Sequence, residues 1–249
     1  MKKLIFFDTE TTGRDADDRL CQLAYKTGEE SFCELYNPGK KIPPDASAVH
    51  HISNKMVASK PAFTESKEYK RIKKLFEDKN NILIAHNAIF DVEMLKKEDI
   101  NIPNFICTLR VARHLDKEGK IEKYNLQYLR YFLDIEVEAA AHDAMGDVVV
   151  MEKLFERLKD RMMAPTEIGV PTEVGKELTE EEVLEKMMDI SSRPSLMRSF
   201  NFGKHVGKKL EEVLASDRGY LEWLLVQKTS SGQNEEDWIY TLKYHLNKK

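Results

Sequence analysis

The sequence lacks the features that mark secreted, zinc-thiolate and membrane proteins. It has three cysteines, Cys21, Cys33 and Cys107, and no Cys-x-x-Cys pair. An odd, scattered set disfavours a disulfide framework or structural zinc site and predicts reduced thiols in a cytoplasmic protein. No stretch approaches the roughly 20 apolar residues of a membrane helix, so we expect no membrane partner.

Excess positive charge is missing as well. The formal net charge is −4, which counts mildly against nucleic-acid binding. The acids are unevenly spread, however. Residues 166–190 carry eight acids and two bases, whereas residues 191–249 carry ten bases and seven acids. The acidity is therefore concentrated in a segment that has the composition of a connector.

Short apolar runs alternate with amphipathic segments, a pattern typical of an α/β layered domain. We predict strands at 3–8, 20–26, 31–36, 82–85 and 105–107, and helices at 65–79, 90–97, 108–118, 125–133, 144–162 and 180–190. The chain divides into a domain at 1–164, an acidic linker and helix at 165–190, and a small module at 191–249. Pro165 and Pro171 mark the linker.

The tail is rich in aromatic residues, which we expect to form the core of the small module: Phe200, Phe202, Tyr220, Trp223, Trp238 and Tyr240. Two interpretations of its first segment stay open. Lys204, His205, Lys208 and Lys209 with Phe200 and Phe202 could form a phosphate and stacking surface, or a solvated turn before a helix near Leu210. If the predicted linker is a mobile tether, truncation near Lys176 should leave the domain at 1–164 folded.

Acidic residues follow two predicted strands. Asp8 and Glu10 end the first strand, where side chains two apart share a face, and Asp91 lies in the helix that follows the strand at 82–85. If these strands are parallel neighbours, the three carboxylates meet at their carboxyl ends. Each acid taken alone also fits an ordinary surface or helix-dipole position, as does Asp147 near the start of a late helix.

His142 lies five residues before Asp147. A lone histidine is more often a surface or packing group, but an imidazole with a pKa near 6.5 can take a proton from water close to neutral pH. Four carboxylates without a Cys-His cluster suit Mg²⁺ or Mn²⁺ rather than structural zinc.

Three motifs carry a resemblance to a known family. The segments FFDTETTG, AHNAIFDVEML and HDAMGDVVVMEKLF resemble, in order, the three motifs of the DEDDh (DnaQ-like) 3′→5′ exonucleases. AVHHIS is similar to a further family segment, with His51 in place of the usual glycine, and YNLQYL resembles the short helix before the third motif. The tail, FNFGKHVGKKLEEVL followed by DRGYLEWLL, resembles the C-terminal module of bacterial exodeoxyribonuclease X-like proteins.

This resemblance implies an RNase H-like fold, a mixed five-stranded sheet flanked by helices. It also implies two divalent ions held by Asp8, Glu10, Asp91 and Asp147, with His142 as the general base. The residues implied to bind the terminal nucleotides are Thr9, Thr11, Thr12, Asn87 and Phe90. His50 is a weaker candidate for that pocket, against a capping or packing role.

The implied activity is release of 5′-mononucleotides from free 3′ ends, with DNA single strands or 3′ overhangs favoured. Alternatives are an exoribonuclease, a polymerase proofreading subunit and a non-enzymatic nucleic-acid-binding scaffold, and the module could instead bind a protein. A haloacid-dehalogenase-like phosphatase, with Asp8 as nucleophile, is the weakest alternative, because its late Gly-Asp-x₃-Asp would need an acid at Met151.

Overall fold

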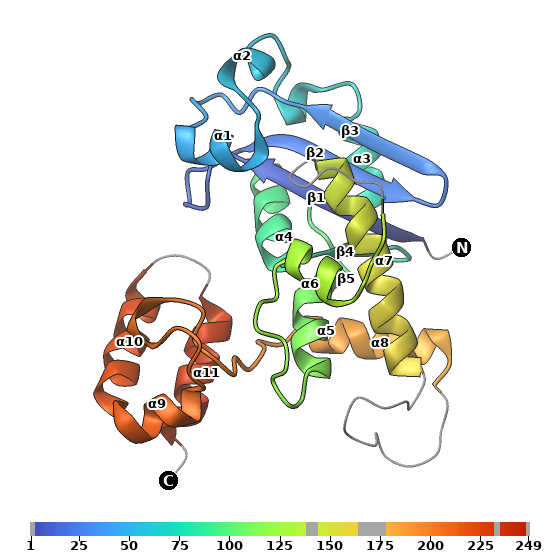
Figure 1. The fold of residues 1–249 in the computed structure, drawn as a ribbon. Helices are drawn as coiled ribbons and strands as arrows, with labels where there is room; N and C mark the ends of the chain where they lie inside the picture. Colours follow the sequence, from blue (N-terminus) through green and yellow to red (C-terminus); the bar gives the residue numbers. More distant parts are fainter. Residues whose placement is uncertain (1–2, 138–143, 164–177, 232–234, 248–249) are drawn as a thin grey trace.

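The computed structural model describes residues 3–137, 144–163, 178–231 and 235–247. Figure 1 shows a twisted sheet with helices on its two faces and a separate group of helices formed by the C-terminal residues. No helix in these ranges is long and apolar enough to cross a membrane.

The sheet has five strands in the order β3-β2-β1-β4-β5. The strands are β1 (Leu4–Thr11), β2 (Leu20–Thr27), β3 (Glu30–Leu35), β4 (Ile82–Ala85) and β5 (Phe105–Cys107). β1, β2 and β3 pair antiparallel, whereas β4 and β5 run parallel to β1. The predicted mixed five-stranded sheet is confirmed, and β1 lies at its centre.

The helices of this domain are α1 (Pro44–His50), α2 (Asn54–Val57), α3 (Tyr69–Phe76), α4 (Ala88–Lys97), α5 (Thr108–Leu115), α6 (Leu126–Phe132), α7 (Ala144–Met163) and α8 (Glu180–Ser191), with a short 3₁₀ turn at Phe63–Glu65. Sequence patterns predicted all of these elements except α1, α2 and the 3₁₀ turn. His51, at the glycine position of the resembled segment, has φ 62° and ends α1 in the left-handed region. A glycine would adopt that conformation without strain.

Two neighbouring phenylalanines of β1 show how the layers are built. Phe6 packs edge-on against Phe155 of α7, while Phe7 packs against Phe76 of α3 on the other face. Successive strand side chains point to opposite faces, so α7 covers one side of the sheet and α3 the other. β4 is buried throughout because both of its faces are covered.

α8 belongs to the core of this domain. It packs against β5, α5 and α7, and Val183, Leu184 and Met187 join the main hydrophobic cluster. The segment predicted as a linker and helix therefore ends in a packed helix, and removing it would expose the core. We therefore expect truncation near Lys176, which also removes α8, to destabilise the domain.

The C-terminal module contains a 3₁₀ turn at Gly203–His205 and the helices α9 (Leu210–Ser216), α10 (Arg218–Ser230) and α11 (Glu236–Asn247). Phe200 and Trp238 stack within its core, and Phe202 and Tyr220 pack against Phe200. The predicted aromatic core is wrong for two members. Trp223 is 54% exposed and Tyr240 is 45% exposed, because each lies on the outer face of its helix.

The predicted stacking surface at the start of the module is also partly wrong. Phe200 is buried, and the buried His205 contacts Asp217 through Nε2 at 3.0 Å. Lys204 pairs with the same carboxylate at 2.7 Å. These groups serve packing and a local ion pair, and the predicted helix begins at Leu210.

A charged contact joins the module to the sheet domain. Arg110 and Arg113 of α5 both bind Asp237 of α11, at 3.0 and 2.6 Å, and Arg110 also pairs with Glu236. Asp237 further accepts hydrogen bonds from the backbone and hydroxyl of Ser195. The module is therefore docked on α5 and is not a freely tethered body.

Candidate active site

The first two predicted metal ligands lie on the α7 face of the sheet. Asp8 and Glu10 are half-buried and share the face of Phe6, which contacts Phe155 of α7. β1 and α7 run in opposite directions, so the chain before Phe155 lies toward the carboxyl end of β1 (Figure 1). At about 1.5 Å per residue, Asp147 lies roughly 12 Å back along α7 from Phe155, which directs it toward this strand end.

Asp91 is joined directly to the same strand. It lies in the first turn of α4, is buried, and its Oδ1 accepts hydrogen bonds from the Thr9 backbone at 3.1 Å and the Thr9 hydroxyl at 2.6 Å. Burial raises the pKa of Asp91 to about 7, although the Thr9 hydrogen bonds act in the opposite direction. The structure thus brings the acid after β4 against the strand that carries Asp8 and Glu10.

Asp147 has a partner that the sequence did not single out. Gln127 of α6 donates from Nε2 to Asp147 Oδ1 at 2.6 Å. The segment YNLQYL pointed to this helix, but which of its residues reaches the carboxylate depends on how α6 packs against α7. Gln127 therefore orients one of the candidate metal ligands.

The predicted nucleotide-binding threonines use their hydroxyl groups within the protein. The Thr11 hydroxyl donates to the Gly13 carbonyl at 2.7 Å, and the Thr12 hydroxyl donates to Asp18 at 2.7 Å. A side chain at Gly13 would collide with Asp18, whose Oδ2 lies 2.3 Å from where its Cβ would be. These contacts fix the backbone that follows β1.

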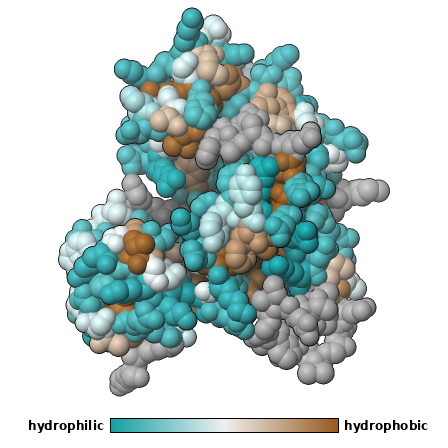
Figure 2. All heavy atoms as spheres, viewed as in Figure 1, coloured by the Kyte–Doolittle hydropathy of each residue, from teal (hydrophilic) through white to brown (hydrophobic). Residues whose placement is uncertain are grey.

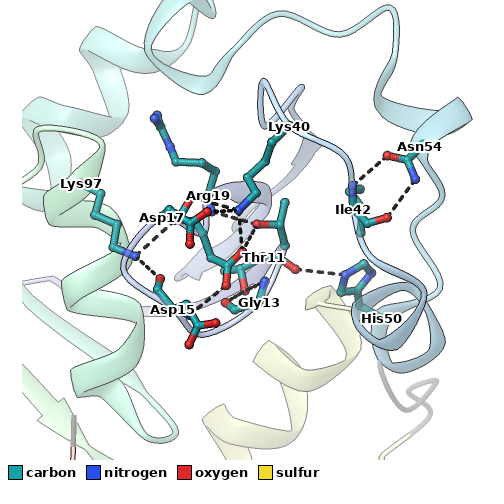
Figure 3. Close-up of polar contacts among 12 residues, drawn as sticks. Thr11, Gly13, Asp15, Asp17, Arg19, Lys40, Ile42, His50, Asn54 and Lys97 are labelled. Carbon is teal, nitrogen blue, oxygen red and sulfur yellow. Dashed lines mark hydrogen bonds and ion pairs between the residues drawn. The ribbon is translucent and has the colours of Figure 1, made fainter. Parts of the chain in front are cut away.

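Two lysines hold the same loop from outside (Figure 3). Lys97 of α4 donates to the carbonyls of Asp15 and Asp18, while Lys40 pairs with the carboxylates of Asp17 and Asp18. Hydrogen bonding to Thr12, Asp15 and Lys40 lowers the pKa of Asp18 against the effect of its burial. The loop beside the candidate site is therefore anchored at several points.

His50 lies next to the end of β1. Its Nε2 is 3.2 Å from the Thr11 carbonyl (Figure 3). Its Nδ1 accepts a hydrogen bond from the Ile52 backbone at 3.0 Å. Burial lowers its pKa. This geometry is that of a packing histidine which also ties α1 to the strand end, so the two predicted roles are compatible.

The remaining predicted site residues are Asn87, Phe90 and His142. Asn87 is exposed and caps α4 with φ 67°, a conformation that asparagine tolerates better than most residues. Phe90 is half-buried against the main hydrophobic cluster. His142 lies outside the described residues, and its role as a base stays a prediction.

The donor set fits a hard divalent cation in its chemistry. Asp8, Glu10, Asp91 and Asp147 offer only carboxylate oxygens, which suit Mg²⁺ or Mn²⁺. Within the described ranges, no three or more His, Cys, Asp or Glu side chains are arranged as a ready metal site. Burial raises the pKa of Asp91, and a bound cation would lower it again by favouring the ionised form.

Comparison with known proteins identifies the family to which each region is similar. Residues 5–155 match the family model for exonucleases (RNase_T), and residues 200–228 match that for the exodeoxyribonuclease X-like C-terminal region. Exodeoxyribonuclease 10 of Escherichia coli K12 is 30% identical over 215 residues, covering 85% of this chain and 83% of that protein.

Two further relatives extend the comparison. A DNA polymerase III subunit epsilon-like protein of Rhodobacter capsulatus is 36% identical over 66% of this chain, but the match spans only 25% of that longer protein. The solved structure described as exonuclease X in complex with 5′ overhanging duplex DNA superposes with a TM-score of 0.55 at 25% identity, covering 77% of this chain and 99% of that one.

These matches decide against the phosphatase and the non-enzymatic scaffold. Proteins of the DEDDh type generally use divalent metal ions, in keeping with the carboxylate donor set. The family match over residues 5–155, together with the relative that covers 85% of this chain, shows that the chain belongs to the DEDDh (DnaQ-like) exonuclease family. It is a 3′→5′ exonuclease acting on nucleic acid.

Proposed function

We propose that this exonuclease acts on DNA, removing 5′-mononucleotides from the free 3′ ends of single strands, overhangs or frayed duplexes. The pair of hydrogen bonds from Thr9 to Asp91 carries the proposal, because it links the acid after β4 to the strand of Asp8 and Glu10. Asp147 supports it from α7 through Gln127. The preference for DNA rests on the relative named exodeoxyribonuclease 10 and on the C-terminal match.

In this mechanism Asp8, Glu10, Asp91 and Asp147 would hold two Mg²⁺ or Mn²⁺ ions. When bound, such ions screen the charge of the phosphate and lower the pKa of water, the two obstacles to phosphodiester hydrolysis. Thr9 keeps Asp91 in place, and Gln127 keeps Asp147 in place. His142 takes the proton from the attacking water.

The last nucleotide binds beside the end of β1. The anchored backbone at Thr11 and Thr12 forms one wall, and Asn87 and Phe90 at the start of α4 form another. His50 supports the first wall through the Thr11 carbonyl. A pocket shaped for a 3′-hydroxyl would reject a bulky, charged 3′-phosphate. The 3′→5′ direction of digestion therefore follows from which end of the strand fits this pocket.

The test is a product analysis with the full chain and Mg²⁺ or Mn²⁺. DNA and RNA, single-stranded and duplex, would be labelled at either end and resolved after partial digestion. We expect 5′-mononucleotides from DNA 3′ ends and slow cleavage of a 3′-phosphorylated strand. Cleavage of circular single-stranded DNA would show an endonuclease, and faster digestion of RNA would favour an exoribonuclease.

A proofreading role is the second candidate. It rests on the 36% identity to a DNA polymerase III subunit epsilon-like protein over 66% of this chain. Preferential removal of a mismatched 3′ nucleotide, strengthened by a replicative polymerase from the same source, would favour it. Equal rates on matched and mismatched ends, unchanged by polymerase, would favour a free-standing exonuclease.

A further inference from the structure

Helix α6 presents aromatic rings to the outside. Tyr131 is 72% exposed and Phe132 is 45% exposed, and the ring of Tyr128 stacks on that of Phe132 at 5.9 Å between centroids. Arg130 lies over the ring of Tyr131 at 5.4 Å. These neighbouring rings form a contiguous aromatic surface, and contiguous exposed apolar surface is a feature of binding sites.

The position of α6 does not depend on Tyr131 or Phe132. The helix is held by Leu129, which is fully buried, and by Asn125, whose side chain caps it by accepting from the Tyr128 backbone at 2.8 Å. Tyr131 and Phe132 are absent from the buried residues of the core. The side chains of Tyr131 and Phe132 can therefore contact another molecule.

Two adjoining cavities flank Tyr131. One, of about 420 Å³, is lined by Lys123, Asn125, Gln127, Tyr128, Tyr131 and Phe132. The other, of about 500 Å³, is lined by Arg130, Tyr131 and residues 134–137. The first has a cation and two side-chain amides beside three aromatic rings, which is the chemistry of a surface for nucleobases. Asp134 and Glu136 make the second less suitable for a phosphate chain.

The surface begins at the candidate active site. Gln127, in the lining of the first cavity, donates directly to Asp147. Tyr131 is four residues after Gln127, and residues at that spacing are neighbours on one helix face. A strand whose last nucleotide is at the carboxylates can only extend from there through nucleotides on its 5′ side, because the enzyme acts from the 3′ end.

We propose that unpaired bases on the 5′ side of the nucleotide being removed stack on Tyr131 and Phe132, in the cavity bounded by Lys123, Asn125 and Gln127. This inference rests on the proposed function, since it concerns the same site. The α6 surface would select single-stranded or frayed substrates, because a base inside a duplex has no free face to stack on these rings.

Binding can be measured without hydrolysis. The full chain, wild type and Tyr131→Ala, would be titrated with a fluorescent oligothymidylate in Ca²⁺, which we expect to support binding but poor turnover. Loss of one stacked base costs about 1–3 kcal/mol, so affinity should fall between roughly 5-fold and 150-fold. Tyr131→Phe should keep wild-type affinity, and Tyr240→Ala, an exposed aromatic change on α11, should have no effect.

Kinetics would locate the effect. With Mg²⁺, Tyr131→Ala should raise KM for the oligothymidylate and leave kcat nearly unchanged. Hydrolysis of thymidine 5′-monophosphate p-nitrophenyl ester, which has no bases on the 5′ side, should not change. A strand with abasic sites next to its last nucleotide should bind wild type and variant equally.

Equal affinity of wild type and Tyr131→Ala for the normal oligonucleotide would overturn the inference and leave α6 as a surface for a protein. Failure of the wild type to hydrolyse both the ester and the oligonucleotide would instead overturn the proposed function. The binding titration in Ca²⁺ would still decide the role of Tyr131 in that case.

Discussion

The nuclease domain and the C-terminal module are stabilised in different ways. The domain has a continuous hydrophobic cluster between a five-stranded sheet and its helices, whereas the module buries a much smaller set around Phe200, Leu221 and Trp238. The module is joined to α5 by charged groups, Arg110 and Arg113 with Asp237. The candidate metal-binding carboxylates lie in the sheet domain, whose packed core fixes the strands and helices that carry them.

The contact between the two regions depends on the pairing of two arginines with acidic partners. Arg110 is buried, and burial lowers the pKa of Arg113, so both cations depend on their acidic partners. Removing one partner of a buried ion pair leaves an uncompensated charge, which is more costly than losing an exposed pair. Docking should therefore respond sharply to a single acid, while the sheet domain should not.

The largest expected effect is on stability and depends on whether a truncated chain keeps α8. A chain ending after Ser192 keeps α8 and should remain folded and active on short substrates. A chain ending near Lys176 loses the burial of Val183, Leu184 and Met187, about 1.5–3 kcal/mol each, which approaches the whole stability of a domain. Thermal unfolding of both fragments would check this, and equal stability would show that α8 is dispensable.

A change at the carboxylates should leave stability intact and remove activity. Asp8→Ala should slow hydrolysis by at least roughly 10³-fold, the scale for losing electrostatic stabilisation of a transition state. Asp45→Ala, an exposed acid on α1, is the matched control and should keep the full rate. A folded Asp8→Ala protein with near-normal turnover would refute the proposed metal site.

His142→Ala should slow the chemical step by about 10²- to 10⁴-fold, the usual range for a general base. Oligonucleotide affinity in Ca²⁺ should change little. The wild-type rate should rise with pH as an imidazole loses its proton, and the variant should lose that dependence. An unchanged rate and pH profile would exclude His142 as the base.

The contact between module and domain should fail with one substitution. Asp237→Ala leaves Arg110 and Arg113 without a shared partner, and we expect a loss of about 3–5 kcal/mol in docking. Faster proteolysis between Ser192 and Arg198, with unchanged kcat on short substrates, would report this. Glu222→Ala removes an exposed pair with Arg218 and should have almost no effect.

The smallest effect concerns pH and the sheet domain. His86 Nε2 donates to the Tyr124 carbonyl at 2.7 Å, and burial lowers the pKa of His86 to about 4. The unfolded chain binds the proton near pH 6.5, so this contribution is present above pH 6.5 and is lost as pH falls toward 4. His86→Gln should flatten the unfolding free energy against pH in that window, measured by urea titration. A slope equal to that of wild type would assign the effect to other groups, such as His114.

Local patterns were sufficient for much of the fold. β4 was predicted at its observed bounds because four apolar residues between polar ones suit a strand covered on both faces. α1 and α2 were missed because their positions depend on contacts such as the Ile42–Asn54 hydrogen bonds, which join residues 12 apart (Figure 3). Trp223 was misplaced because hydrophobic character does not specify which side of a helix faces the core.

Figure 2 shows hydrophobic and hydrophilic residues interspersed on the visible surface of both regions. Composition alone therefore does not identify which face binds a substrate or a partner. The sequence by itself determined the order of the motifs, the alternation of strands and helices, and the residue types that could hold a metal ion. These depend on periodicity and on chemistry carried by single side chains.

Tertiary structure decided the rest: the hydrogen bonds of Asp91 to Thr9 and of Gln127 to Asp147, the place of α8 in the core, and the docking of Asp237 on α5. Each of these joins residues far apart along the chain. Such contacts form only when whole elements pack, so their partners are set by the shape of the folded chain and not by any local pattern.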